Sequence, residues 1–138
     1  MSFNLTRLPT PKLIDIRSNY QEITEEFCKY YYSIYDTNFI ALSTLYYLES
    51  QFTFQNEEFI GFYNLVNKIK SHGLEKFTHS NLNVNVQPIG QKNLEIIIYG
   101  HISLNDSIFS NKFIENVILQ RDDNNRIFVI STIFKIIE

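Results

Sequence analysis

The sequence has no tryptophan, one cysteine, four glycines and three prolines among its 138 residues. The single cysteine, Cys28, cannot form an internal disulfide, which excludes a disulfide-rich scaffold and favours a reducing compartment. Four scattered glycines cannot form a glycine-rich phosphate loop. Neither Gly-x-Ser-x-Gly nor His-Glu-x-x-His occurs, so two common signatures of hydrolases and zinc proteases are missing.

Long runs of one residue kind are also missing. No apolar run reaches the ~18 residues that a membrane-spanning helix requires, and residues 1–11 lack the apolar block of a signal peptide. No run of Lys or Arg occurs, and the net charge is −3, which argues against a dedicated nucleic-acid surface. We therefore predict a soluble intracellular protein that contacts neither nucleic acid nor membrane directly.

Aromatic side chains are abundant instead. The chain has 12 Phe and 9 Tyr, and hydrophobic residues make up 44% of it, which argues against global disorder. A chain of this length buries one core. We predict an N-terminal arm over residues 1–17 and a single domain over residues 18–138, because no repeat or linker divides the remainder.

The predicted fold is organised around the stretch 27–36. Helical spacing places four bulky side chains of this stretch on one face: Phe27, Tyr31, Ile34 and Tyr35. Because these side chains are bulky, they need a deep hollow to be buried in. The concave side of a curved sheet provides such a hollow better than a close helix–helix contact does. A helix packed into a curved sheet is the first structural prediction.

Local signals set the helix boundaries. Ser18 and Gln21 match the Ser-x-x-Gln capping box, so the first helix is predicted from about residue 19 to Tyr35. Residues 36–38 end this helix, and a shorter one is predicted through Leu42, Leu45 and Tyr46. Gly61 precedes a third helix, and Gly73 ends it in the left-handed conformation. The apolar stripe of that helix is Phe62, Leu65, Val66 and Ile69.

The rest of the chain reads as strands. A short strand at 51–54 turns at residues 55–57. Alternation and turn residues then predict four further strands, at 81–86, 94–104, 113–120 and 127–137. In the first of these, Leu82, Val84 and Val86 are expected on the buried face. The fold class is therefore α+β, a cone made of a strongly bent antiparallel sheet packed on three helices.

Candidate chemical groups are few. His72, His79 and His101 share no metal-ligand spacing, so neither a metal site nor a cofactor is predicted. The carboxylate pairs 57–58 and 122–123 fall in turns, where solvation is a better explanation than acid–base catalysis. An enzyme of this shape would place its reactive groups inside the cone. The inward-facing candidates are Tyr31, Tyr35, Asp36 and Tyr99, whose spacing is more typical of a core, so we predict no enzymatic activity.

Over residues 20–137 the chain resembles the nuclear transport factor 2 family. The likeness is carried by short matches in a conserved order of elements: Phe27, Tyr31-Tyr32 and Asp36; Leu45-Tyr46; residues 53–61; the third helix to Ile69; His79-Ser80; Gln87-Pro88; Gly100; Phe113, Val117 and Leu119; and residues 133–135. The resemblance implies a nuclear transport factor 2-like, cystatin-like roll with an open cavity. It also implies a homodimer formed through the outer sheet face, with Ile97, Tyr99, Ile118 and Val129 as candidate interface residues.

Members similar to the transport factor itself bind GDP-loaded Ran and the Phe-Gly repeats of nucleoporins, and neither role is catalytic. The resemblance implies a partner-binding site made of Phe54, Gln55, His79, Asn105, Asp106, Ser107 and Phe134. Phe54 stands where the transport factor typically has Trp, and Gln55 where it has a Glu that pairs with a Ran lysine. The rim at residues 105–107 also has fewer carboxylates than the family, so Ran binding is expected to be weaker.

Three functional interpretations remain open. The first is a nucleocytoplasmic transport factor located in the cytoplasm, in the nucleus and at nuclear-envelope pores. The second is a dimerising adaptor domain like those of messenger-RNA export or stress-granule proteins, to which the chain is closer at Gln55, Asn105 and Ser107. The third is a cavity enzyme similar to ketosteroid isomerase or scytalone dehydratase. The overall likeness favours the first.

Overall fold

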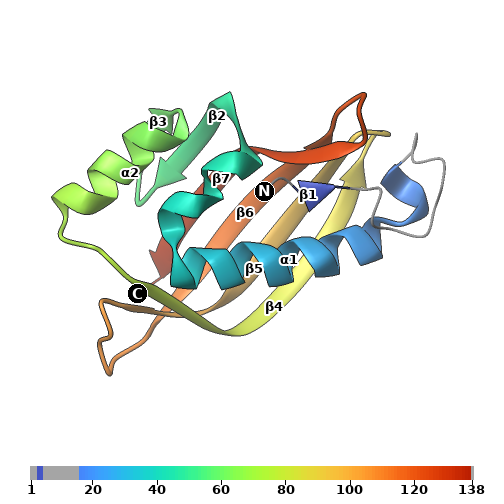
Figure 1. Cartoon of the computed structure of the whole chain (residues 1–138). Helices are drawn as coiled ribbons and strands as arrows, with labels where there is room; N and C mark the ends of the chain where they lie inside the picture. The colour runs from blue at the N-terminus through green and yellow to red at the C-terminus, as the bar shows by residue number, and fades with distance from the viewer. Residues whose placement is uncertain (1–2, 5–15, 138) are drawn as a thin grey trace.

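The computed structural model describes residues 3–4 and 16–137. Within these ranges the chain forms two α-helices, two 3-10 helices (η) and seven strands (Figure 1). In chain order they are β1 (Phe3–Asn4), η2 (Ile16–Ser18), α1 (Tyr20–Thr37), η3 (Phe39–Leu45), β2 (Tyr46–Phe54), β3 (Glu57–Ile60), α2 (Phe62–Ser71), β4 (Phe77–Ile89), β5 (Asn93–Leu104), β6 (Asn111–Arg121) and β7 (Arg126–Ile137).

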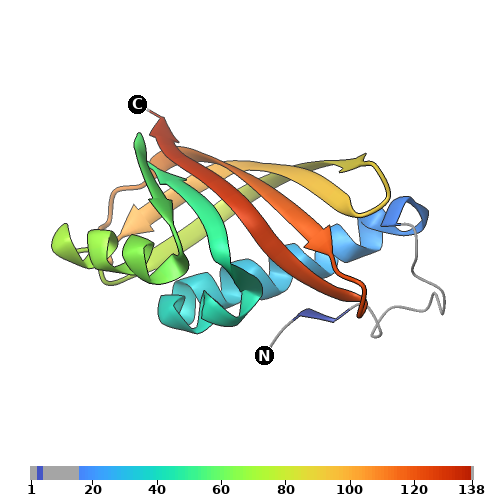
Figure 2. The same cartoon turned by 90° about the horizontal axis from the view of Figure 1, so that it is seen from above.

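The predicted α+β roll is confirmed. The strands form one bent sheet in the order β3-β2-β7-β6-β5-β4, and β1 pairs beside the start of β7. The sheet is mixed, because β2 runs parallel to β7 while the other strand pairs are antiparallel. Figure 2 shows that the helices cover one face of the sheet and leave the other face uncovered. The core therefore lies between the helices and the concave inner face.

Helix α1 lies across that inner face (Figure 1). Of the predicted face, Phe27, Tyr31 and Tyr35 are buried there and Ile34 is half-buried. Phe27 stacks on Tyr31 at a centroid distance of 5.0 Å. The capping prediction was wrong: the N-cap residue is Asn19, which makes no side-chain capping hydrogen bond, because Ser18 belongs to the preceding turn η2. The helix ends at Thr37, two residues later than predicted.

Left-handed backbone positions turn the chain at the predicted places. Gln55 and Asn56 both have positive φ, and they close the β2–β3 hairpin. Gly61 precedes α2 and Gly73 follows it, both in the left-handed region. The predicted stripe of α2 is buried: Phe62, Leu65, Val66 and Ile69. The segment predicted as a second helix is the 3-10 helix η3, and Tyr46 is the first residue of β2 instead.

A β-bulge in β4 changes which side chains face inward. Ser80 pairs with His101 and Asn83 pairs with Tyr99, so two residues of β4 stand opposite Gly100. A Cβ atom at Gly100 would lie 2.7 Å from the Ser80 carbonyl oxygen, so only glycine fits this position.

Beyond the bulge the expected burial of β4 is not found. Leu82 and Val84 are exposed, whereas Val86 is half-buried. The reason is that β4 is an edge strand with a neighbouring strand on one side only. The prediction that this alternating stretch buries one full face was therefore wrong for two of its three apolar residues.

The proposed arm over residues 1–17 lies largely outside the described residues. Of its described part, β1 pairs with Arg126 and Ile127 at the start of β7. Ile16 is buried, and its N–H donates to the Gln91 carbonyl oxygen at 2.9 Å. The division into arm and domain stays a prediction. Within the described chain, no helix is long and apolar enough to cross a membrane.

Candidate functional site

A partly buried clamp joins the end of α1 to the start of β4. The Asp36 carboxylate accepts a hydrogen bond from the His79 N–H at 2.9 Å, and its other oxygen lies 2.6 Å from His79 Nδ1. The His79 side chain is fully buried among the rings of Tyr32, Tyr35 and Phe113. Its Nε2 atom has no hydrogen-bond partner among the described residues. Asp36 belongs to α1 and His79 to β4. Because both oxygens of Asp36 contact His79, the pair fastens the helix to the sheet.

Next to the clamp lies a buried carboxyl group that the sequence analysis did not select. Glu115, on the inner face of β6, is only 2% exposed. Its oxygens accept hydrogen bonds from the hydroxyls of Tyr31 at 2.9 Å and Tyr32 at 2.8 Å. Burial raises the pKa of Glu115, while the nearby His79 and the two phenol donors act in the opposite direction. The pKa of both tyrosines is raised, first by burial and then by Glu115.

The space around this carboxyl group is filled. A cavity of about 10 Å³ lies there, lined by Glu115 together with aromatic side chains from α1, β2 and β7. A single water molecule needs ~10–15 Å³ measured in this way, so the cavity has no room for an organic substrate. In this conformation the buried polar groups are part of a packed core.

An aromatic row continues from His79 toward the end of the cone. The ring centroid of Phe113 lies 5.1 Å from that of His79 and 5.9 Å from that of Phe134. Phe134 in turn stacks on Phe54, with the two ring centroids 4.9 Å apart. Phe54 and Phe134 are adjacent because the parallel register of β2 and β7 pairs them directly. Both are buried, so Phe54 fills the inner face of its own strand. A role for these rings in partner binding stays a prediction.

Gln55 follows Phe54 in the hairpin turn and is exposed. Its side-chain oxygen accepts a hydrogen bond from the Ile136 N–H at 2.7 Å, and its own N–H donates to the Phe134 carbonyl oxygen. The amide thus fixes the end of β7 against the turn. If Gln55 accepted a hydrogen bond from a partner, as a carboxylate does, its side-chain oxygen would have to serve both the partner and the Ile136 N–H.

The loop between β5 and β6 forms one rim of the cone. We call residues 105–110 the rim loop. Asn105 fastens it: its side-chain oxygen accepts from the N–H groups of Glu75 and Lys76, and its amide nitrogen donates to the Gly73 carbonyl oxygen. Asp106 forms an exposed ion pair with Lys76 at 2.8 Å. The Ser107 hydroxyl oxygen accepts from the Phe109 N–H, which orders the remainder of the loop.

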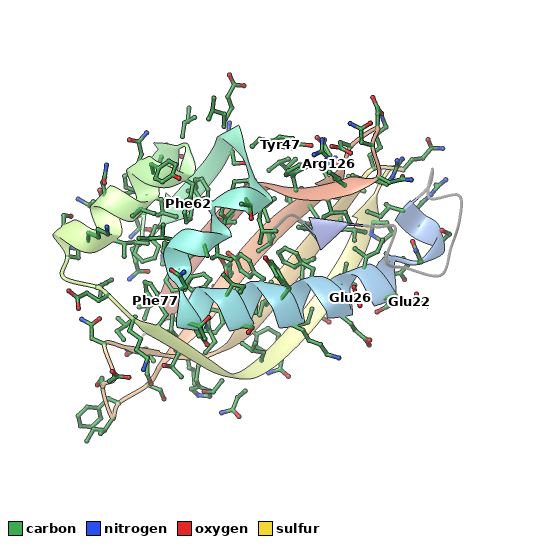
Figure 3. All side chains as sticks on the ribbon, viewed as in Figure 1. Glu22, Glu26, Tyr47, Phe62, Phe77 and Arg126 are labelled. Atoms are coloured by element: carbon green, nitrogen blue, oxygen red, sulfur yellow. The ribbon has the colours of Figure 1, made fainter. Side chains whose placement is uncertain are left out.

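A groove of about 920 Å³ runs beside this loop, between the end of α1, η3, α2 and the start of β4. Phe39 lies on its wall and contacts Phe62 and Phe77, labelled in Figure 3, at 5.3 and 5.4 Å. The apolar lining is Phe39, Ile40, Val66, Ile69, Leu74 and Phe77. Charged groups line the groove too: Asp36, Lys70, Glu75, Lys76 and Asp106. The groove is large enough for a segment of a partner protein.

The seven predicted partner residues therefore divide into two groups. His79, Phe54 and Phe134 belong to the buried aromatic row. The exposed group contains Gln55 and the start of the rim loop, residues 105–107. The proposed inward position of Tyr99 was wrong, because this residue is exposed on the outer sheet face.

The outer face carries an apolar patch, which we call the outer patch. Strand register places five side chains on it: Ile97, Tyr99, Ile114, Ile118 and Ile133. Of the four interface candidates named above, Val129 is excluded, because it is fully buried on the inner face. The reason is a β-bulge at Ile130 in β7, where Ser131 pairs with Ile118 and Val129 pairs with Leu119. The bulge shifts the alternation of side chains along the strand, and the sequence pattern did not predict it.

No cluster of three or more His, Cys, Asp or Glu side chains within residues 3–4 and 16–137 is suited to hold a metal ion. The carboxylate pairs have local partners. Glu57 forms an ion pair with Lys68 at 3.0 Å, and Asp122 accepts from the N–H groups of Asn124 and Arg126 in the β6–β7 turn. The predicted turn position of the first pair was wrong, because Glu57 and Glu58 are the first two residues of β3. Asp122 orders the β6–β7 turn as predicted.

A family model described as the nuclear transport factor 2 domain matches residues 23–136. The chain is 26% identical to nuclear transport factor 2B of Arabidopsis thaliana over 115 residues, which cover 83% of this chain and 91% of that protein. The solved structure of nuclear transport factor 2 from Cryptosporidium parvum superposes with a TM-score of 0.75 at 25% identity, covering 85% of this chain and 94% of that one. Yeast UBP3-associated protein BRE5 has the same fold, with a TM-score of 0.67 at 20% identity, covering 87% of this chain and 98% of that one.

Proposed function

The chain belongs to the nuclear transport factor 2 domain family, and from this premise we propose that it is a non-enzymatic nucleocytoplasmic transport factor. Its proposed partners are a Ran-like GTPase in the GDP form, the Phe-Gly repeats of nucleoporins, or both. Its proposed locations are the cytoplasm, the nucleus and the pores of the nuclear envelope. The near full-length similarity to named transport factors supports this role.

One structural observation carries the non-enzymatic part of the proposal. The cavity that contains the reactive groups measures about 10 Å³, whereas the groove beside the rim loop measures about 920 Å³. Binding sites for small substrates occupy ~300–1,000 Å³ and enclose reactive groups. Here the available space lies in the groove, which Asp36 lines but Glu115 does not, at a surface where a protein segment can dock.

The proposal is tested by binding of the purified protein to GDP-loaded Ran, with GTP-loaded Ran as the nucleotide control. Asp106→Lys is the site variant, because Asp106 is the carboxylate of the rim loop and lines the groove. Glu22→Lys, an equal charge reversal in the first turn of α1 (Figure 3), is the matched control. We expect selective binding of the GDP form and a loss of ~10-fold or more in affinity for Asp106→Lys alone. Absence of binding to either form would contradict the GTPase part of the proposal.

A second candidate, the dimerising adaptor, is favoured by a different observation. The side chains of Gln55 and Asn105 are engaged in internal hydrogen bonds, so they are not available to replace the carboxylates of a GTPase site. The outer patch remains exposed and apolar. Both candidates include a homodimer through this patch. Ile133→Glu, at a residue 51% exposed, should convert a dimer into a monomer in sedimentation at micromolar concentration. A wild-type monomer there would contradict the homodimer.

A further inference from the structure

Strand β4 leaves one long border of the sheet open to another strand. It is the last strand in the sheet order, and among the described residues it pairs with β5 alone. Figure 1 shows β4 along the border of the sheet. The backbone N–H and C=O groups that point away from β5 can pair with a further strand, so such an edge is an interaction site unless the chain blocks it.

Features that block a strand edge lie at the two ends of β4. Near its start, the His79 N–H is already bonded to the Asp36 carboxylate, and a β-bulge follows between Ser80 and Asn83. Near its end, Pro88 has no N–H group. Residues 77–91 contain no Asp, Glu, Lys or Arg, so no charge protects the part between. We call this part, residues 83–87, the free edge.

The side chains of the free edge are arranged symmetrically about Asn85. Their order is Asn, Val, Asn, Val, Gln. When two copies of this stretch pair antiparallel around a two-fold axis at Asn85, Val84 of one copy stands opposite Val86 of the other, and Asn83 stands opposite Gln87. Apolar side chains then meet apolar ones and amides meet amides at each position. The free edge is therefore complementary to itself.

The strand register places the two kinds of side chain on opposite faces of the sheet. Val84 and Val86 pair with Ile98 and Ile96, which are buried on the inner face. Val84 itself remains 40% exposed at the border. A second copy beside it extends the inner apolar layer and covers Val84. On the outer face, the exposed Asn85 side chains of the two copies can hydrogen-bond to each other.

We propose that the free edge of β4 pairs antiparallel with the free edge of a second copy, centred on Asn85, so that two sheets join into one. A second copy fits for two reasons. The edge carries no charge that would select an acidic or basic segment, and its side-chain order matches the same strand reversed. The contact is short, so it is weak and transient. It goes beyond the proposed function and is separate from the outer patch.

The test measures disulfide cross-linking in a Cys28→Ser, Ile133→Glu background, which removes the native thiol and the contact through the outer patch. In the proposed register, Asn85→Cys places two thiols opposite each other, with Cα atoms about 4.5–5.5 Å apart, which a disulfide can span. Asn83→Cys is the matched control, because Asn83 is also exposed and lies on the same face. Its two thiols lie four residues apart, about 13 Å along the strand.

We expect a cross-linked dimer from Asn85→Cys at about 200 µM protein, a concentration suited to a weak contact. Asn83→Cys should give ~10-fold less, because its thiols are too far apart. Sedimentation of the Ile133→Glu variant should also show a dimer at this concentration. Adding Val84→Lys should remove that dimer, because a charge then enters the apolar row. Leu48→Lys, at an exposed residue of β2, should leave it unchanged.

Three results would overturn the self-pairing. Equal cross-linking of the two cysteine variants would mean that the copies meet without a fixed register. A monomer at all concentrations, or a dimer that Val84→Lys leaves intact, would mean that the edge holds no second copy. If the chain stays monomeric and a Phe-Gly repeat peptide shifts the backbone amide NMR signals of residues 83–87, the edge binds a strand of a partner instead.

Discussion

Strand β6 presents very different side chains to the two sides of the sheet. Its inner side carries Phe113, Glu115 and Val117, and all three are buried. Its outer side carries Ile114 and Ile118, which retain contact with water. A carboxyl group thus lies in the core while isoleucines lie on the surface, which reverses the usual distribution of polar and apolar residues.

The reversal separates the groups that hold the molecule together from those that a partner can reach. Glu115 and the Asp36–His79 clamp tie α1 to the sheet through phenol, imidazole and backbone donors. Among the described residues, the side chains of the outer patch and of Ile108 and Phe109 in the rim loop make no hydrogen bonds of this kind, and most of them are exposed. The polar core is therefore structural, and the exposed apolar residues are the better candidates for function. Each prediction below tests this difference.

The largest effect is expected from neighbouring residues on opposite faces of β6. Phe113→Ala removes a buried ring that contacts Tyr32, His79 and Phe134, and should cost about 3–5 kcal/mol of unfolding free energy. Ile114→Ala should cost about 1 kcal/mol or less, because this side chain is partly exposed. Urea denaturation measures both. Equal losses would mean that the outer face is packed as closely as the inner one.

The Asp36–His79 clamp should rank second. Asp36→Ala leaves the His79 N–H and Nδ1 without their acceptor in a buried setting, which should cost about 2–3 kcal/mol. Asp106→Ala removes an exposed ion pair and should cost about 0–1 kcal/mol. Thermal unfolding followed by circular dichroism compares the two variants. Similar destabilisation would show that the buried clamp contributes no more than a surface pair.

The third effect is a pH dependence contributed by Glu115. Its pKa in the folded protein is raised above the ordinary 4.5, chiefly by burial, so the folded state binds this proton more tightly than the unfolded state. The stabilising contribution is complete below the unfolded pKa and is lost as the pH rises through the folded pKa. Glu115→Gln removes this titration.

The measurement is the unfolding free energy of wild type and Glu115→Gln from about pH 4 to pH 8. The stability of wild type relative to the variant should decrease as the pH rises. The comparison keeps the other titratable neighbours, Tyr31, Tyr32, Cys28 and His79, in both proteins. Parallel stability curves for the two proteins would contradict a buried titrating carboxyl group.

The smallest expected effect is a change of reactivity without a change of stability. Burial, with a smaller contribution from Glu115, raises the pKa of Cys28 to about 12. A disulfide reagent at pH 8 should therefore react with the native thiol roughly a thousandfold more slowly than with the unfolded chain. A cysteine placed on the outer patch, as Ile133→Cys in a Cys28→Ser background, should react at an ordinary rate. Rapid labelling of native Cys28 would mean that this side of α1 opens readily.

Helix spacing allowed much of the fold to be predicted from sequence. The stripe of α2 and the aromatic face of α1 each repeat often enough to identify the buried side without knowledge of the partner element. The N-cap was missed because Ser18 and Asn19 are both good capping residues, and the choice depends on the turn that precedes them.

Facing directions in the strands were less predictable. Tyr99 was predicted both inside the cone and on the outer sheet face, and the structure agrees with the second position. Val129 was placed on the wrong side because a bulge in β7 changes the alternation of side chains, and this bulge depends on contacts between strands. Glu115 was missed because its tyrosine partners lie 83 and 84 residues earlier in the chain. One signal was present: a carboxyl residue occupies an inward position between Phe113 and Val117 in an otherwise apolar alternation.

The parallel pairing of β2 with β7 has a consequence for how the chain reaches its native state. Residues 51–54 pair with residues 131–134, so β2 keeps one unpaired edge until β7 has been synthesised and has folded beside it. Contacts between distant segments slow folding, and an open strand edge with apolar side chains is prone to aggregate in the meantime. Phe52 and Phe54 lie on that strand. We therefore expect the free edge of β2 to be prone to aggregation until β7 covers it.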